Sequence, residues 1–177
     1  MVLTLDRPLA GGITTGVEAV ADHLLDFLGV AQPPTPMVLV GLCDLERPVR
    51  VLYRPLSGVR ASLVLDPDWG WLITVDSRLG QHERRFATFH EGGHILLRRG
   101  LLHAPWGQEE AVASQVARAL LMPRRWLVPA PQQERHLCLL ARRLLVSRTR
   151  LTARLHQLGA LHSHGRAQRY LGRLPRP

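Results

Sequence analysis

The sequence predicts an α+β fold, in which a small antiparallel sheet packs on a pair of helices and a C-terminal helical region follows. Three short β-type runs lie between residues 49 and 75. Two long segments with helical periodicity come next, and two shorter helical segments follow them. Strands gathered in one part of a chain and helices in another are typical of α+β architecture. At 177 residues the chain can bury one sizeable core, so we expect one main domain.

The N-terminal part contains one clear helical segment and one ambiguous segment. Residues 13–29 carry apolar side chains at helical spacing, and Pro33-Pro34 lies just beyond them. Residues 35–46 are compatible with two structures. Thr35-Pro36 is a good start for a short helix, whereas Met37–Leu42 is equally compatible with a strand.

The three β-type runs are bounded by turn residues. They cover residues 49–53, 61–65 and 71–75. The segment Asp66–Gly70, between the second and third runs, is rich in residues that favour turns. We therefore expect the last two runs to form an antiparallel hairpin.

A helix predicted at about 80–99, with Gly100 as its C-cap, contains the pattern H-E-x-x-H. Residues four apart share one helix face, so His90 and His94 can aim two imidazoles at one metal ion. Glu91 then falls beside the ion, where it can take a proton from water. This is the zinc metallopeptidase, or zincin, arrangement. The apolar residues on both sides of the motif favour it over two surface histidines on an ordinary helix.

Two glycines inside the motif are unusual for a helix. Gly92 and Gly93 each cost roughly 0.5–1 kcal/mol of helix stability relative to alanine. Small residues there allow another backbone to approach closely, either for packing or for binding a substrate.

A second helix, predicted from Gln108 to Met122, offers a third metal ligand. Glu110 lies on one face with Ala113, whereas Glu109 groups with Val112. Either glutamate is also explained as a first-turn acid that the helix dipole favours. Spacing alone does not choose between the two. Candidates for an additional transition-state donor are Tyr53 and His103, which no pattern singles out.

The C-terminal part predicts two further helices. Residues 132–145 and 148–158 have apolar positions at helical spacing, and Ser147 between them is a good N-cap. Two short helices joined by a tight turn resemble a helix-turn-helix, although an ordinary helical hairpin is an equally good interpretation. We expect a zincin-like domain over residues 1–128, a helix-turn-helix-like region over 129–162, and a mobile basic tail over 163–177.

Positive charge is concentrated near the C-terminus. Residues 124–177 hold 12 arginines and one acidic residue, whereas residues 1–123 hold 11 arginines and 13 acidic residues. Such a basic segment favours nucleic acid or an acidic protein surface as a partner. A solvated, arginine-rich exterior without a specific partner is the alternative.

Two patterns that the sequence does not contain indicate the cellular compartment of the protein. No apolar run approaches the roughly 18 residues of a membrane span, and the N-terminus has no signal-peptide pattern. Cys43 and Cys138 are not spaced as a metal-binding pair, and we expect both to be buried, reduced thiols. We therefore expect a cytoplasmic protein without membrane association.

Three segments together resemble the ImmA/IrrE family of metallopeptidases. They are Ile73-Thr74-Val75-Asp76, then Arg85 to His94, then the helix from Glu110 to Leu120-Leu121-Met122-Pro123. The resemblance extends over about residues 70–160 and implies that Glu110, thirteen residues before the closing proline, is the third ligand. Ser114 stands where the family usually has Asn, which leaves the orientation of the ligands open.

The resemblance also implies a function. A cytoplasmic zinc endopeptidase is expected, with Zn²⁺ held by His90, His94 and Glu110 and with Glu91 as general base. Its expected substrate is a helix-turn-helix repressor, whose cleavage relieves repression of phage, mobile-element or stress genes. The alternative is a non-catalytic module that binds a repressor or DNA and carries a vestigial or structural metal site.

Overall fold

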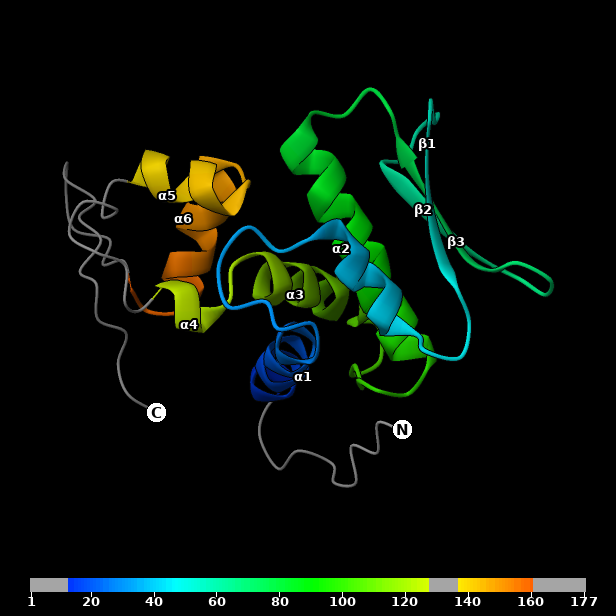
Figure 1. The fold of residues 1–177 in the computed structure, drawn as a ribbon, viewed down its shortest axis with the longest axis horizontal. Helices are drawn as coiled ribbons and strands as arrows, with labels where there is room; N and C mark the ends of the chain where they lie inside the picture. Colours follow the sequence, from blue (N-terminus) through cyan, green and yellow to red (C-terminus); the bar gives the residue numbers. More distant parts are fainter. Residues whose placement is uncertain (1–12, 128–136, 161–177) are drawn as a thin grey trace.

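The computed structural model describes residues 13–127 and 137–160, which form a mixed α+β fold (Figure 1). The predicted class is confirmed. The elements in chain order are α1 (Ile13–Phe27), the 3₁₀ helix η1 (Met37–Cys43), β1 (Val49–Arg54), β2 (Ala61–Asp66), β3 (Gly70–Asp76), α2 (Gln81–Arg98), α3 (Glu109–Leu121), α4 (Arg124–Leu127), α5 (Leu137–Leu144) and α6 (Arg148–Gln157).

The three-stranded sheet is mixed, whereas the sequence predicted an antiparallel one. The predicted hairpin is present, because β2 pairs antiparallel with β3. However, β1 pairs parallel with β3, and the strand order is β1-β3-β2. Alternating polarity identifies strands but not their order. The strand with the most buried side chains, β3, takes the centre, where Trp71, Ile73 and Val75 are almost completely covered.

The helices follow the predicted periodicity with small shifts at their ends. The ambiguous segment after the first helix is η1, so its helical alternative is confirmed. Ser147 caps α6 by accepting a hydrogen bond from the backbone N–H of Arg150. The expected residues 132–136 of the next-to-last helix, and the expected basic tail, lie outside the described residues.

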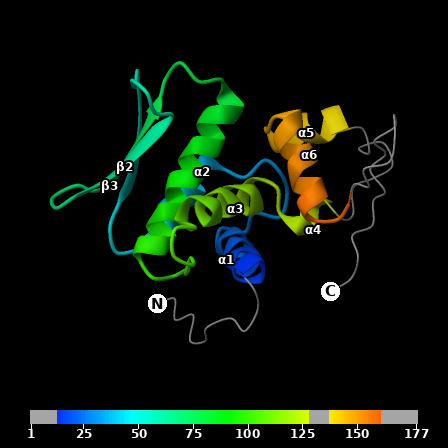
Figure 2. The ribbon, with the colours of Figure 1, turned by 180° about the vertical axis from the view of Figure 1, so that it is seen from behind.

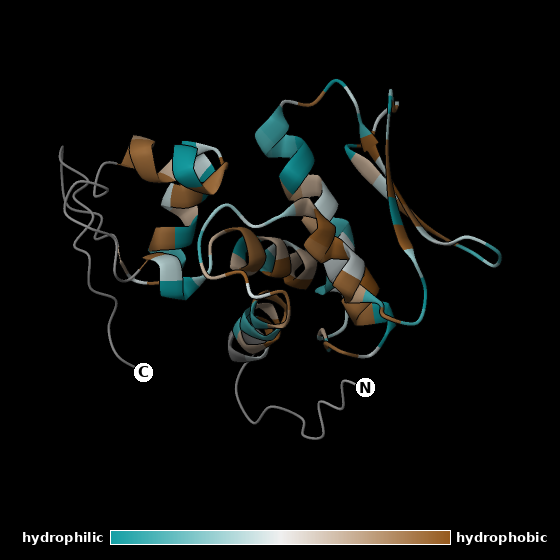
Figure 3. Cartoon of the chain, in the orientation of Figure 1, coloured by the Kyte–Doolittle hydropathy of each residue, from teal (hydrophilic) through white to brown (hydrophobic). Residues whose placement is uncertain are grey.

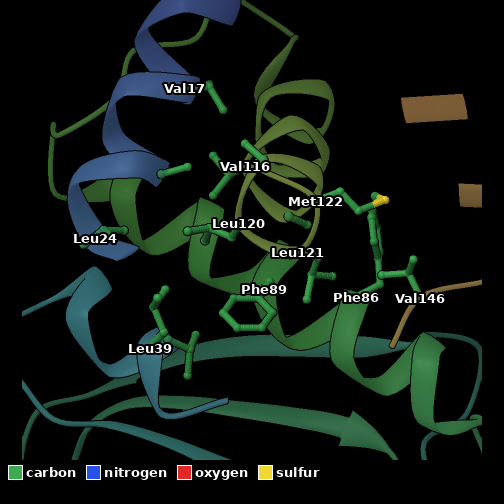
Figure 4. Close-up of a cluster of buried hydrophobic side chains, with 14 of the residues drawn as sticks. Val17, Leu24, Leu39, Phe86, Phe89, Val116, Leu120, Leu121, Met122 and Val146 are labelled. Carbon is green, nitrogen blue, oxygen red and sulfur yellow. The ribbon is translucent and has the colours of Figure 1, made fainter. Parts of the chain in front are cut away.

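The sheet lies on one side of α2, and the short C-terminal helices lie on the other side of the molecule (Figures 1 and 2). The first turns of α2 are hydrophilic and its later turns are largely apolar (Figure 3). The core fills the space between α1, α2, α3 and η1. Figure 4 shows buried side chains that these elements and their neighbours contribute, among them Val17, Leu24, Leu39, Phe86, Phe89, Val116, Leu120, Leu121, Met122 and Val146.

The α2–α3 crossing explains the paired glycines. A Cβ atom added at Gly93 would lie 2.7 Å from the Cα atom of Ala113 on α3. A Cβ atom added at Gly92 would lie 3.0 Å from a methyl carbon of Val40 and 3.1 Å from the Sγ atom of Cys43. The glycines therefore serve packing, which was one of the two uses that the sequence left open.

A buried arginine fixes the C-terminal helices to the rest of the fold. Arg154 of α6 is completely buried. Its guanidinium donates to the backbone carbonyl of Met122 at 3.1 Å and forms a 2.6 Å ion pair with Glu18 of α1. Removing one partner of such a buried pair typically costs about 3–5 kcal/mol, because the other charge stays buried. The contact therefore joins α6 to both α1 and the end of α3.

Among the described residues, no helix combines the length and the apolar character needed to cross a membrane.

We predict that Gly93→Ala destabilises the protein, because the added methyl group forces the α2 and α3 backbones apart. Overpacking of this kind typically costs about 1–3 kcal/mol. Gly41→Ala is the matched control, since a Cβ atom there would meet nothing within 4 Å. Thermal unfolding followed by circular dichroism should show a lower Tm for Gly93→Ala alone. Equal Tm values for the two variants would contradict the close approach of the helices.

Candidate metal centre

Three potential metal ligands meet where α2 crosses α3. The Nε2 atoms of His90 and His94 are 3.2 Å apart. The carboxylate of Glu110 lies 3.1 Å from the first of these nitrogens and 3.2 Å from the second. All three side chains offer ligand atoms within 4.8 Å of one another, and this is a group that could hold a metal ion.

The helix crossing determines which glutamate joins the histidines. His90 lies three residues before Gly93, and Glu110 lies three residues before Ala113, the residue that touches Gly93. Both side chains therefore project from the turn next to the contact point. Glu109 is displaced by about 100° around α3 and is not part of the cluster. The packing thus distinguishes the two glutamates that spacing alone left equivalent.

Ser114 makes a contact that sequence reasoning missed. Its hydroxyl lies 3.2 Å from Nδ1 of His90. When the Nδ1–H donates to this oxygen, the lone pair of Nε2 is free for a metal ion and the hydrogen bond holds the ring in orientation. The signal was present in the sequence, because Ser114 follows Glu110 by one helical turn and so shares its face.

Burial sets the ionisation of the central residues. The pKa of His90 is lowered mainly by burial, with a further contribution from His94, which favours the neutral imidazole that can bind a metal. The pKa of Glu91 is raised to about 7, first by burial and then by the negative charge of Glu110, while Arg98 opposes the shift. A carboxylate with a pKa near neutrality is suited to accept and release protons.

A cavity of about 520 Å³ opens over the cluster. Its walls come from four elements or their flanks: the start of β2, one face of α2, the first turns of α3, and α6. The lining residues are Val59, Arg60, Ala61, Ser62, Leu63, Glu83, Phe86, Ala87, His90, Glu91, His94, Arg98, Glu110, Ser114 and Arg150.

The two suggested transition-state donors are not among the residues that line this cavity. Tyr53 lies on β1, at the sheet edge opposite to β2, and the Arg84 guanidinium carbon lies 5.4 Å from the centre of its ring. His103 is exposed in the segment between α2 and α3. Arg60, Arg98 and Arg150 are the cationic groups that the structure brings to the cavity instead.

The donor set fits a divalent metal ion. Two imidazole nitrogens and one carboxylate oxygen suit a first-row divalent ion, and three protein ligands leave a position open for a reactant.

We predict that the protein binds about one divalent ion per chain, with zinc as the probe. His90→Ala, His94→Ala and Glu110→Ala should each lower the bound zinc, because each removes one of three ligands. Glu109→Ala is the matched control and should keep the metal. Elemental analysis after dialysis provides the measurement. Loss of zinc in Glu109→Ala but not in Glu110→Ala would contradict the assignment.

We further predict that Ser114→Ala weakens zinc binding about 10–100-fold, the usual effect of losing a hydrogen bond that orients a metal-bound histidine. The methyl group cannot accept the Nδ1–H of His90, so the ring loses its orientation. Ser114→Thr keeps the hydroxyl and should keep most of the affinity. Competition with a chelating dye measures the change, and unchanged affinity in Ser114→Ala would show that this contact does not orient the ring.

Comparisons with known proteins find a similar fold and a family for this chain. A solved structure named as a Mycobacterium tuberculosis transcriptional regulator matches with a TM-score of 0.61 and 17% identity, over 81% of this chain and 47% of that chain. At this identity the match concerns the fold, and this chain spans about half the length of that structure. No curated protein matches the chain. The model of the Peptidase_M78 family, described as the IrrE N-terminal-like domain, matches residues 46–156. The chain therefore belongs to this family of metallopeptidases, as its motifs suggested.

Proposed function

We propose that the protein is a zinc-dependent endopeptidase that cleaves a helix-turn-helix transcriptional repressor, and so relieves repression of phage, mobile-element or stress genes. The observation that carries this proposal is the cluster of His90, His94 and Glu110 with Glu91 beside it in an open cavity. The family provides the expectation of a metallopeptidase.

The three ligands would hold zinc through two nitrogens and one oxygen. A zinc ion with an open position supplies Lewis-acid activation of water and of the scissile carbonyl. The close approach of α2 and α3 at Gly93 and Ala113 supports this arrangement, because it brings together the two helices that carry the three side chains. Ser114 supports the ring of His90 from behind.

Glu91 is the proton carrier of the proposed reaction. It lies on α2 next to a ligand and lines the cavity. It would take the proton of the attacking water and then deliver that proton to the amine that leaves. Such general acid–base transfer typically contributes about 10²–10⁴-fold. Burial raises the pKa of Glu91, which makes its carboxylate a better proton acceptor.

The sheet edge supports binding of an extended peptide. Within the described sheet, β2 pairs only with β3, and the residues at its start line the cavity. An extended peptide can add to such an edge through main-chain hydrogen bonds. This surface is short. We therefore infer that the folded repressor is recognised mainly by a surface outside the cavity. The arginine-rich C-terminal helices would form this surface and bind an acidic patch of the repressor.

We predict that the zinc-loaded protein cuts the repressor encoded next to its gene into two fragments, and that Glu91→Gln abolishes the cut. Glutamine cannot carry the proton, but it leaves the metal ligands unchanged. Elemental analysis should therefore show unchanged zinc in Glu91→Gln, and gel electrophoresis should show an intact repressor. Glu109→Gln is the matched control and should cut normally. Cleavage by Glu91→Gln would refute the mechanism.

A second candidate function is nucleic-acid binding by the C-terminal helices. Arg148, Thr149, Thr152, Ala153 and His156 line a surface hollow on the exposed face of α6, and Arg142 and Arg143 are exposed on α5. Phosphate contacts of this kind give binding that weakens with salt and depends little on sequence. A mobility-shift titration with duplex DNA at low salt is the test. If the DNA does not shift at micromolar protein, these arginines belong to an ordinary solvated surface that binds no nucleic acid.

A further inference from the structure

The charged groups of the cavity are distributed unevenly between its ends. Three arginines and three glutamates line it among the described residues. All three glutamates are committed to other tasks: Glu110 faces the two histidines, Glu91 is the proton carrier, and Glu83 binds arginines. No carboxylate of the cavity is therefore left to bind a basic side chain of a peptide.

Two arginines meet at the end of the cavity near the start of α2. Glu83 accepts hydrogen bonds from Arg150 of α6 at 2.6 Å and from Arg60, just before β2, at 2.5 Å. One carboxylate thus serves two guanidiniums, and this end keeps an excess positive charge. The Arg60 side chain is 67% exposed and uses one nitrogen for Glu83, so it can also bind a second carboxylate.

A third arginine lies at the other end. Arg98, four residues after His94, is exposed and lines the cavity. Within residues 13–127 and 137–160 it forms no ion pair, and its guanidinium carbon lies 5.8 Å from the centre of the Trp71 ring. It is close enough to influence Glu91 electrostatically.

Apolar groups occupy the stretch between the two ends. Phe86 and Ala87 line the cavity from α2, one turn before His90, and Leu63 faces it from β2. The guanidinium of Arg150 lies 3.5 Å from the centre of the Phe86 ring, a cation–π arrangement that holds this aromatic floor in place.

We propose that the cavity selects an extended peptide segment that carries an acidic side chain on each side of the scissile bond, with an apolar side chain between them. The acidic groups would bind Arg60, with Arg150 beside it, at one end and Arg98 at the other. This inference rests on the proposed function and names the class of substrate sequence for the same site.

Helix geometry sets the spacing. Glu83, which holds the arginine pair, lies seven residues before His90, or about 10 Å along the helix. That length corresponds to about three residues of extended peptide. Arg98 lies four residues after His94, about 6 Å, or about two residues of peptide in the other direction. Basic side chains at these positions of the peptide would be repelled by the arginines. The cavity would therefore exclude basic peptides as well as attract acidic ones.

Three synthetic peptide mixtures test the proposal. Each contains the same varied apolar centre, flanked on both sides by Asp and Glu, by Asn and Gln, or by Lys and Arg. Fluorescence anisotropy measures binding to the zinc-loaded Glu91→Gln protein, and mass spectrometry measures cleavage by the wild type. We expect the acidic mixture to bind about tenfold more tightly than the neutral one, as for two partly exposed charge pairs, and the basic mixture to bind most weakly.

Two variants assign the preference to residues. Arg60→Gln and Arg98→Gln should each reduce the acidic preference, and Arg98→Lys should keep it, since the positive charge remains. Arg50→Gln is the matched control, because Arg50 lies over the Trp69 ring and does not line the cavity. A preference for the acidic mixture that survives both Arg60→Gln and Arg98→Gln would overturn the assignment.

The experiment distinguishes failure of the acidic preference from failure of the proposed endopeptidase activity. Equal binding of the three mixtures, or no binding of the acidic mixture at millimolar peptide, overturns the specificity. Cleavage by the wild type without an acidic preference also overturns the specificity while supporting the endopeptidase. Selective binding of the acidic mixture without any cleavage refutes the endopeptidase and supports the binding preference.

Discussion

The candidate site depends on the contact between Gly93 of α2 and Ala113 of α3. These two backbones touch so closely that a single added carbon would collide with the opposite helix. The contact sets how closely the two helices approach at this point. His90 and Glu110, each three residues before the contact on its own helix, are therefore brought face to face. A metal site whose ligands come from two helices needs such a contact. Close packing restricts both helices to small displacements, so the ligands keep their relative positions.

The rest of the fold supports this pair of helices from three sides. The sheet packs beside α2, and α1 packs against α3. The C-terminal helices contribute Arg150, which lines the cavity and donates two hydrogen bonds to the carboxylate of Glu83 in the first turn of α2. The carboxylate of Glu83 thus joins α2 to α6 and, through Arg60, to the chain just before β2. The same arginines therefore shape the charge of the cavity and connect its walls.

Local patterns in the sequence predicted much of this structure. The H-E-x-x-H helix, the helix that carries Glu110 and the β2–β3 hairpin all follow from periodicity and turn residues within short windows. The strand order did not follow, because it depends on how β3 is covered by distant elements. The single turn α4 is too short to show a period. The cationic groups of the cavity were also missed: Arg60 and Arg150 are 90 residues apart in sequence and meet only through Glu83, whereas the suggested Tyr53 and His103 do not line the cavity.

The buried pair of Arg154 and Glu18 has a consequence for how the chain folds. These residues are 136 positions apart, so the pair closes a loop that contains nearly all of the other described elements. Closing so long a loop costs much chain entropy, and contacts of high sequence separation are associated with slow folding. If this pair forms after the transition state, it acts mainly on the unfolding rate. The pair would then slow unfolding of the native protein, because it holds α6 against α1.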